Sequence, residues 1–278
     1  YLRGRFHWSN RSAEGLETAL EHFRRAIALD SAYALAYSGL ADGFAVLPYY
    51  SGRSDPRSAF VQGLDAAQEA IRLAPDLAKA HASRGYLRLV SRRDWKGAEV
   101  DLRRAVALDP SYPTAHHWLS DLLAFSGRYE EAIAEEQRAL ELDPLSFVSN
   151  FTLGHRYYWA GQFERAANQY ERTVALHPSN FLGWAGLSEV MYLTGDVQSG
   201  ALYGRRGDEL FGLGPSLVDL LTERQSRFYE TGEANTLPPA VDTVAGYTPP
   251  MRARSAMLVG DTTRALDWIE RSVEEEWP

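Results

Sequence analysis

The chain of 278 residues contains no cysteine. This absence excludes disulfide bonds, thiolate metal sites and cysteine nucleophiles. The chain also lacks any run of about 18 apolar residues, the length that a membrane-spanning helix requires. Its start, Tyr1-Leu2-Arg3-Gly4-Arg5, does not have the basic-then-apolar order of a signal peptide. We therefore expect a cytoplasmic protein without a membrane span, and we interpret the missing initiator methionine as the mark of a processed or excised fragment.

The chain also has fewer basic than acidic residues, 29 against 37, which gives a formal net charge of -8. Without a basic patch such a chain repels nucleic acid, and the sequence shows no such patch. It shows no phosphate-binding loop, zinc-protease motif or nucleophile elbow either. Hydrophobic residues make up 45% of the chain, which is enough for a continuous core. We expect a folded protein that is neither an enzyme nor a nucleic-acid binder.

Three short segments that end on proline recur at steps of 34 residues: Ala107-Leu108-Asp109-Pro110, Glu141-Leu142-Asp143-Pro144 and Ala175-Leu176-His177-Pro178. Weaker copies end at residues 31 and 75. A period of this length is typical of a helix-turn-helix repeat, in which a proline after the second helix stops that helix. The period therefore predicts a stack of helical hairpins.

The hairpin that ends at Pro178 carries small, aromatic and turn residues in a fixed order. They are Leu153, Gly154, Tyr157, Gly161, Phe163, Ala166, Tyr170 and Pro178. This order closely resembles that of the tetratricopeptide repeat family. Small residues such as Gly154 let two helices approach closely, while Tyr170 fills the space between neighbouring hairpins. Gly127 and Gly161 suit left-handed caps where a first helix ends.

The resemblance implies an all-α fold, a right-handed α-α superhelix or solenoid of about seven helical hairpins that form a single array over residues 1–278. We expect a partial repeat at 1–31, a repeat with a long turn at 32–75, regular repeats at 76–110, 111–144 and 145–178, a degenerate repeat at 179–214, and irregular C-terminal repeats at 215–278. Proline, glycine and serine place the long turn at 47–56, and Tyr49 and Tyr50 make it either a projecting binding loop or a plain enlarged turn. The glycines between 200 and 214 predict a soft helix.

Two stretches are more specific than the general repeat: residues 1–5 with 14–16, followed by 33–42, and residues 78–85, and the ending at 265–272 resembles a last hairpin of the same kind. They are similar to segments in the C-terminal repeat arrays of bacterial multidomain signalling proteins and transcriptional regulators. Those proteins carry a winged-helix, nucleotide cyclase or kinase domain at the N-terminal side. The resemblance implies that this chain is the sensor or docking part of a larger bacterial regulator.

In the tetratricopeptide family the first helix of each hairpin lines a concave groove that holds peptides or helices. Carried over position by position, the groove contains His117, Trp118, Asp121, Phe125, Phe151, His155, Tyr158, Trp159, Glu189 and Tyr192, with Asp42 and Tyr86 further toward the N-terminus. Aromatic rings beside carboxylates suit a peptide with basic and bulky apolar side chains. The alternative is that many of these aromatic residues pack between helices as core.

Four of the groove residues could instead meet at one level and hold a divalent metal ion: His117, Asp121, His155 and Glu189. His117 and Asp121 share a helix face because they are four residues apart. Polar groove residues are far commoner without a metal than with one, so we predict no metal and no cofactor.

Three functions compete at this point. The first is a scaffold for protein-protein interaction that binds a protein or peptide in the groove. The second is a metal-binding or enzyme-associated repeat domain. The third is a self-associating module, in which the incomplete first hairpin exposes an apolar face and forms a homodimer.

Overall fold

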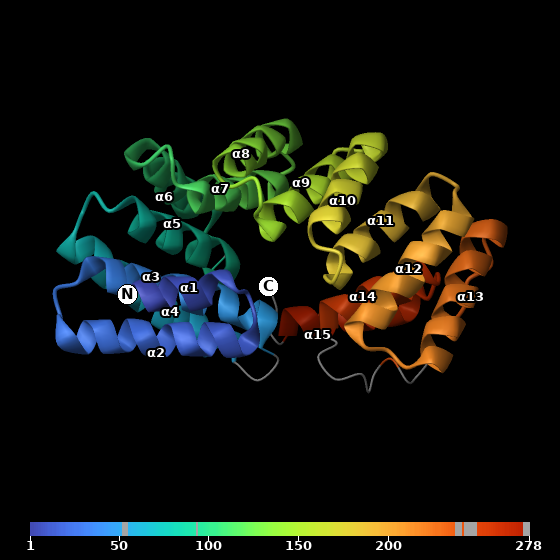
Figure 1. The fold of residues 1–278 in the computed structure, drawn as a ribbon, viewed down its shortest axis with the longest axis horizontal. Helices are drawn as coiled ribbons and strands as arrows, with labels where there is room; N and C mark the ends of the chain where they lie inside the picture. Colours follow the sequence, from blue (N-terminus) through green and yellow to red (C-terminus); the bar gives the residue numbers. More distant parts are fainter. Residues whose placement is uncertain (52–54, 93, 237–240, 242–248, 275–278) are drawn as a thin grey trace. The chain divides into compact units, whose positions relative to one another are not determined.

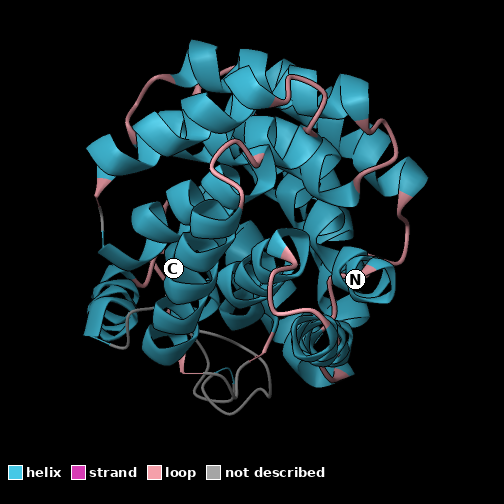
Figure 2. Cartoon of the chain, turned by 90° about the vertical axis from the view of Figure 1, so that its left-hand side faces the viewer, coloured by secondary structure: helices cyan, strands magenta, loops and turns pink. Residues whose placement is uncertain are grey.

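A computed structural model describes residues 1–51, 55–92, 94–236, 241 and 249–274. Within these residues the chain forms fifteen α-helices and one π-helical segment, joined by loops, and no strand (Figure 2). The prediction of an all-α fold is confirmed. Contacts between residues divide the chain into two compact units, here called the N-terminal unit (1–127) and the C-terminal unit (128–274). The single array over 1–278 and the handedness of the superhelix stay predictions.

Helices of the N-terminal unit alternate between two layers. Each helix contacts the next one along the chain, and α1, α3, α5 and α7 also contact one another in succession (Figure 1). This pattern is that of stacked helical hairpins, in which the first helices form one layer. The elements are α1 (Leu2–Ser9), α2 (Ala13–Leu29), α3 (Ala34–Tyr50), α4 (Pro56–Leu73), α5 (Ala78–Leu87), the π-helical segment (Arg88–Arg92), α6 (Trp95–Leu108) and α7 (Pro113–Phe125).

The C-terminal unit repeats the same alternation. Successive helices from α8 to α13 contact each other, α9 also contacts α11, α11 also contacts α13, and α14 pairs with α15. The elements are α8 (Tyr129–Leu142), α9 (Phe147–Trp159), α10 (Phe163–Leu176), α11 (Phe181–Leu193), α12 (Val197–Phe211), α13 (Pro215–Thr231), α14 (Pro249–Leu258) and α15 (Thr262–Glu274). A buried cluster of residues from 213–265 joins α13 to the α14–α15 pair.

Short polar side chains and glycines fix where many helices begin and end. The side chains of Ser12, Asp94 and Ser146 each accept a hydrogen bond from the backbone N–H three residues on, which satisfies one of the free donors of the first turn. After α7 and α9, Gly127 and Gly161 have φ of 75° and 72°, a left-handed conformation that favours glycine. The predicted caps at both glycines are confirmed.

The enlarged turn begins later than the sequence indicated. Helix α3 continues through Pro48 to Tyr50, although Pro48 cannot donate a helical hydrogen bond. Pro48 is buried, and the Tyr86 hydroxyl donates to the Tyr49 hydroxyl at 3.0 Å, so packing keeps the last turn helical. The prediction that 47–50 belong to a turn is therefore wrong. Residues 52–54 of the predicted turn lie outside the described residues.

The π-helical segment Arg88–Arg92 absorbs one extra residue. Gly85 packs against Leu102 of the second helix in its hairpin, as Gly154 packs against Tyr170. Leu102 and Tyr170 are two 34-residue periods apart, whereas Gly85 and Gly154 are 69 residues apart. The surplus residue lies between Gly85 and Leu102, and a π-helical turn accommodates such an insertion within a helix.

Rings sandwiched between glycines hold neighbouring hairpins together. In the C-terminal unit the Tyr170 ring lies so close to Gly154 of α9 and Gly186 of α11 that a Cβ atom at either glycine would stand 2.5 or 2.7 Å from it. In the N-terminal unit the Phe23 ring takes the same place between Gly4 and Gly39, with 2.5 Å at both. Burial of one such ring contributes about 1.5–3 kcal/mol, so these contacts are major links between hairpins.

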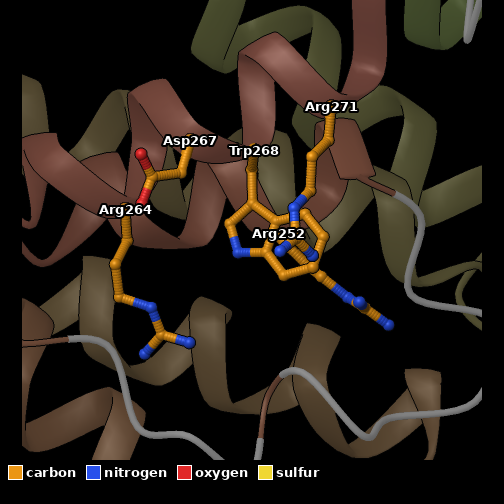
Figure 3. A pocket seen from close by; sticks show the side chains of 5 residues that line it. All are labelled: Arg252, Arg264, Asp267, Trp268 and Arg271. Carbon is orange, nitrogen blue, oxygen red and sulfur yellow. The ribbon is translucent and has the colours of Figure 1, made fainter. Parts of the chain in front are cut away.

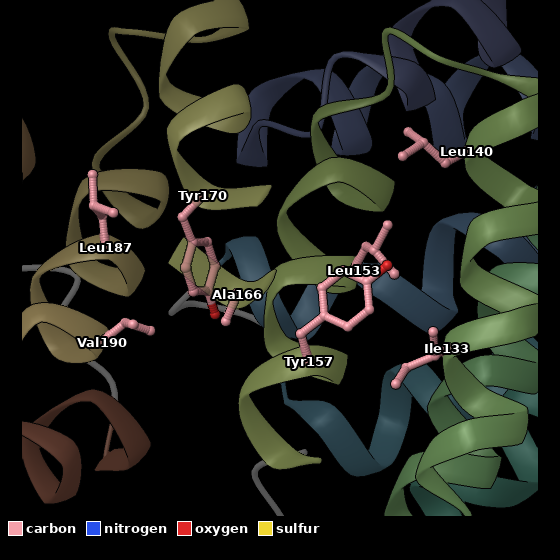
Figure 4. Packing of buried hydrophobic residues seen from close by; sticks show 8 residues of the cluster. All are labelled: Ile133, Leu140, Leu153, Tyr157, Ala166, Tyr170, Leu187 and Val190. Atoms are coloured by element: carbon pink, nitrogen blue, oxygen red, sulfur yellow. The ribbon is translucent and has the colours of Figure 1, made fainter. Parts of the chain in front are cut away.

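Small residues at 34-residue steps allow the helices of one hairpin to approach. Ala98, Ala132 and Ala166 are 0% exposed. In the same core cluster as Ala166, Leu153 and Tyr157 of α9 point toward Ile133 of α8 (Figure 4). The next residue in the series is Gly200 of α12. A Cβ atom at Gly200 would stand 2.8 Å from the Tyr192 ring, so the ring occupies the space that a side chain would need. Gly200 therefore has a packing role in α12, a helix for which the sequence predicts only low stability.

Candidate functional site

An aromatic ladder runs along one face of α9. Phe151, His155 and Trp159 recur every fourth residue, which brings them to the same side of a helix. The ring centroids of Phe151 and His155 are 4.4 Å apart in an edge-to-face arrangement, and the rings of His155 and Trp159 stack at 5.8 Å with planes 4° apart. Phe151 and His155 are half-buried, and Trp159 is 39% exposed. The ladder thus offers aromatic surface to solvent from a fixed helix.

The fully buried Tyr170 supports the ladder from behind. Its ring lies 5.9 Å from Phe151 and 5.8 Å from His155. Since Tyr170 is itself sandwiched between two glycines, the backing of the ladder has little freedom to move. The aromatic surface is therefore preorganised, which lowers the entropy that a ligand must overcome on binding.

One carboxylate accompanies the ladder. The Tyr158 hydroxyl of α9 donates a hydrogen bond of 2.7 Å to Glu189 Oε1 of α11. Both side chains are half-buried. This bond orients the Glu189 carboxylate, which carries an acceptor group to the side of the ladder on α9. The structure brings together Phe151, His155, Tyr158, Trp159 and Glu189, five of the ten residues that the sequence indicated, and we call them the α9–α11 wall.

Two other predicted groove residues are core. Trp118 is 1% exposed and stacks on Tyr86 with centroids 4.8 Å apart. Tyr192 is 2% exposed and stacks on Tyr229 at 4.7 Å. Side chains this deeply buried stabilise the fold and offer no surface to a ligand. In contrast, Phe125 at the end of α7 is 51% exposed.

His117 and Asp121 lie on α7, as their spacing predicts. His117 Nε2 is 3.7 Å from the Asp121 carboxylate, with 13% and 15% of the two side chains exposed. They belong to the N-terminal unit, whereas His155 and Glu189 belong to the C-terminal unit. Among the described residues, no three histidine, aspartate or glutamate side chains converge closely enough to hold a metal ion.

A buried ion pair in the N-terminal unit was not foreseen. Asp42 of α3 is 0% exposed, and it accepts hydrogen bonds of 2.5 Å from both Arg5 of α1 and Ser83 of α5. Burial raises the pKa of Asp42, and Arg5 and Ser83 oppose that rise. The three residues tie three first helices together. Because they are 37 and 41 residues apart, no local pattern signals the contact.

A second cation lies near this pair. Arg11, between α1 and α2, has a φ of 47°, which is unusual for a residue with a side chain. Its guanidinium lies 3.8 Å from the Trp8 ring centroid, and Arg5 lies 4.2 Å from the same centroid. Burial lowers the pKa of Arg11. The first helices of the N-terminal unit therefore bury charged groups as well as the aromatic pair of Tyr86 and Trp118.

A further charge cluster fastens α5 to α6. Asp101 of α6 accepts two hydrogen bonds from Arg84, at 2.8 and 2.6 Å, and one from Arg88 at 2.7 Å. Burial raises the pKa of Asp101, but the neighbouring His81 and the hydrogen bonds and charge of Arg84 outweigh it, so the pKa lies below its usual value. This cluster is structural, since it joins the two helices of one hairpin.

Known proteins resemble this chain in sequence pattern and in fold. Residues 87–147 and 151–215 match the family model described as tetratricopeptide repeat. These residues carry tetratricopeptide repeats. No curated protein matches the sequence. In the described part of the chain, no helix combines the length and the apolar character that crossing a membrane requires.

Solved structures of repeat proteins share the fold at low sequence identity. A structure of pilF from Pseudomonas aeruginosa is 18% identical with a TM-score of 0.56, over 88% of this chain and 92% of that one. YrrB, a tetratricopeptide repeat protein with an unusual peptide-binding site, is 16% identical with a TM-score of 0.50, over 74% and 99%. The Cut9-Hcn1 hetero-tetramer of APC/C is 12% identical with a TM-score of 0.62, over 94% and 50%. These likenesses concern the fold.

Proposed function

We propose that this chain is a non-catalytic scaffold that binds an extended segment of a protein or peptide along the α9–α11 wall. The observation that carries the proposal is the ladder of Phe151, His155 and Trp159, half exposed and held from behind by Tyr170. Rigid aromatic side chains contribute strongly to protein interfaces because few of their rotamers are lost on binding. The repeat fold, which generally serves protein-protein interaction, supports the same function.

The chemistry of the wall favours a ligand with both basic and bulky apolar side chains. Exposed aromatic faces attract Lys or Arg by about 0.5–1 kcal/mol each. The Glu189 carboxylate, oriented by Tyr158, supplies an anionic partner beside the ladder. For the N-terminal unit, taken by itself, we propose Phe125 and the His117–Asp121 pair as contact residues for a ligand. Trp118 and Tyr192 support the fold and do not touch the ligand.

We further propose that the scaffold works in the cytoplasm as the sensor or docking part of a larger bacterial regulator. This context comes from the similarity of residues 33–42 and 78–85 to the C-terminal arrays of such regulators. It implies that the ligand is a protein segment whose binding is passed on to another domain.

Selection from a displayed peptide library tests the function, followed by calorimetry of the selected peptide with purified variants. Trp159→Ala and Glu189→Gln should weaken binding about tenfold or more, because each removes a contact at the centre of the wall. Trp95→Ala is a matched control, since Trp95 is also 39% exposed but begins α6, a second helix. Selected peptides that bind Trp159→Ala as tightly as the wild type would contradict the proposal.

Self-association is the second candidate, and one observation favours it. On α1, Leu2 is 80% exposed and Phe6 is 67% exposed, and the two are one helical turn apart. An apolar stripe of this kind is a candidate contact for a second copy. Light scattering over a dilution series should show a dimer that Phe6→Glu dissociates. A monomer at all concentrations would remove this candidate.

A further inference from the structure

A pocket outside the α9–α11 wall lies on the C-terminal hairpin. It has a volume of about 300 Å³ and is lined by Arg252 of α14 and by Arg264, Asp267, Trp268 and Arg271 of α15 (Figure 3). Trp268 projects from α15 with Arg264 to one side of it and Arg271 to the other (Figure 3). Among the described lining residues three guanidinium groups accompany one carboxylate, whereas the whole chain has a formal charge of -8. The pocket is a basic site on an acidic protein.

The indole ring holds two of the cations in place. The guanidinium carbons of Arg252 and Arg271 lie 4.7 and 4.6 Å from the Trp268 ring centroid. Trp268 is 8% exposed, so the ring is fixed by the surrounding fold. The indole ring attracts both guanidinium groups and so holds two like charges in one pocket. An anion that binds in the pocket offsets the repulsion between these cations.

Arg252 supplies a second, independent observation. Its Nε atom is buried and has no hydrogen-bond partner in the described part of the chain. A buried N–H without an acceptor is costly and uncommon in folded proteins. An anionic oxygen atom in the pocket would accept from this donor. Guanidinium groups are planar forks that suit the oxygens of phosphate and carboxylate groups.

We propose that this pocket, here called the Trp268 pocket, binds a phosphate monoester. Three arginines and one aspartate give the described lining a formal charge of +2, which matches the dianion of a phosphate monoester better than the single charge of a carboxylate. A volume of about 300 Å³ stands at the lower end of the range for small-molecule sites and accommodates a phosphate with part of the group that carries it. The carrier is either a phosphorylated side chain or a small phosphorylated molecule.

Calorimetry on the full chain with inorganic phosphate, phosphoserine and adenosine 5′-monophosphate tests the proposal, with serine as the unphosphorylated control. All three phosphates should bind and serine should not. Tighter binding of phosphoserine would identify a phosphorylated protein segment as the source, and tighter binding of the nucleotide a small molecule. Absence of binding by all three phosphates, or equal binding of serine and phosphoserine, would overturn the proposal.

Variants distinguish the pocket from general attraction of anions. Arg252→Gln and Arg271→Gln should each weaken phosphate binding about tenfold. Asp267→Asn should tighten binding severalfold, because it removes a negative charge from the lining. Arg172→Gln changes an exposed arginine of α10 and should leave binding unchanged. Arg271 is exposed, so its variant keeps the test valid if Arg252→Gln fails to fold. Unaltered binding by Arg271→Gln and Asp267→Asn would contradict the proposal.

Discussion

The helical hairpins of the two units stack through the same kind of contact, but the first helices of the two units carry different side chains. In both, an aromatic ring of a second helix lies between two glycines of neighbouring first helices: Phe23 in the N-terminal unit and Tyr170 in the C-terminal unit. The N-terminal unit then buries an ionic cluster around Asp42, whereas the C-terminal unit presents the ladder of Phe151, His155 and Trp159. The repeat therefore determines how the helices pack in both units. The side chains on the first helices, in contrast, differ from one unit to the other.

The largest expected effect tests whether the two sandwiched rings are equivalent. Tyr170→Ala and Phe23→Ala should each lower the free energy of unfolding by about 3–5 kcal/mol, because a large buried ring is replaced by a cavity. Urea denaturation followed by circular dichroism measures this change. Tyr129→Ala is the control, since Tyr129 is 37% exposed. A loss at Phe23 far below the loss at Tyr170 would break the equivalence.

The next prediction concerns the ionic character of the N-terminal unit. Asp101→Asn should destabilise the protein by about 3 kcal/mol at pH 7, because it leaves the partly buried Arg84 and Arg88 without their carboxylate. The pKa of Asp101 is lower in the folded state, so its stabilisation is present above the unfolded pKa of about 3.9 and is lost as pH falls through the folded pKa.

Unfolding measured from pH 7 down to pH 3 follows this loss. The difference between wild type and Asp101→Asn should shrink over the acid end of that range. Asp76→Asn is the control, because Asp76 pairs with Arg104 at 2.7 Å but has 78% of its side chain exposed. A difference that stays constant with pH would show that the charge of Asp101 does not stabilise the fold.

A smaller effect tests the glycines of the sandwich directly. Gly154→Ala should destabilise by about 1–3 kcal/mol, since the added Cβ would stand 2.5 Å from the Tyr170 ring. In Tyr170→Leu the ring is absent, so Gly154→Ala added to it should cost much less than it does alone. Thermal unfolding of the two single variants and the double variant measures the coupling. Strict additivity would show that the ring is not what excludes a side chain at residue 154.

The smallest stability effect concerns the ladder. Trp159→Ala should change the free energy of unfolding by less than about 1 kcal/mol, because its side chain is 39% exposed and its neighbours keep their other contacts. The same variant should lose most of the peptide affinity. A destabilisation as large as that of Tyr170→Ala would assign Trp159 to the core and remove it from the wall.

The sequence predicts the hairpins well because their signals are local. Prolines at 34-residue steps, alanines such as Ala132 and glycines such as Gly161 each act within one repeat. The extension of α3 through Pro48 was missed because packing overrides the usual effect of proline. The π-helical segment at 88–92 was missed because a single extra residue barely changes the 34-residue period.

The candidate site was predictable only in part. The ladder follows from the four-residue spacing of Phe151, His155 and Trp159. The burial of Trp118 and Tyr192 does not, because it depends on rings in neighbouring helices, Tyr86 and Tyr229. The Trp268 pocket was missed as well. The sequence shows no basic patch, since Arg252 and Arg264 converge only when α14 and α15 pair.

The central claim is that the α9–α11 wall is where the ligand binds. Fluorine NMR of protein containing 5-fluorotryptophan tests it most directly, with the signals assigned by single Trp→Phe variants. Addition of a selected peptide should shift the Trp159 signal and leave those of Trp95 and Trp118 in place. A shift at Trp95 with no change at Trp159 would contradict the account.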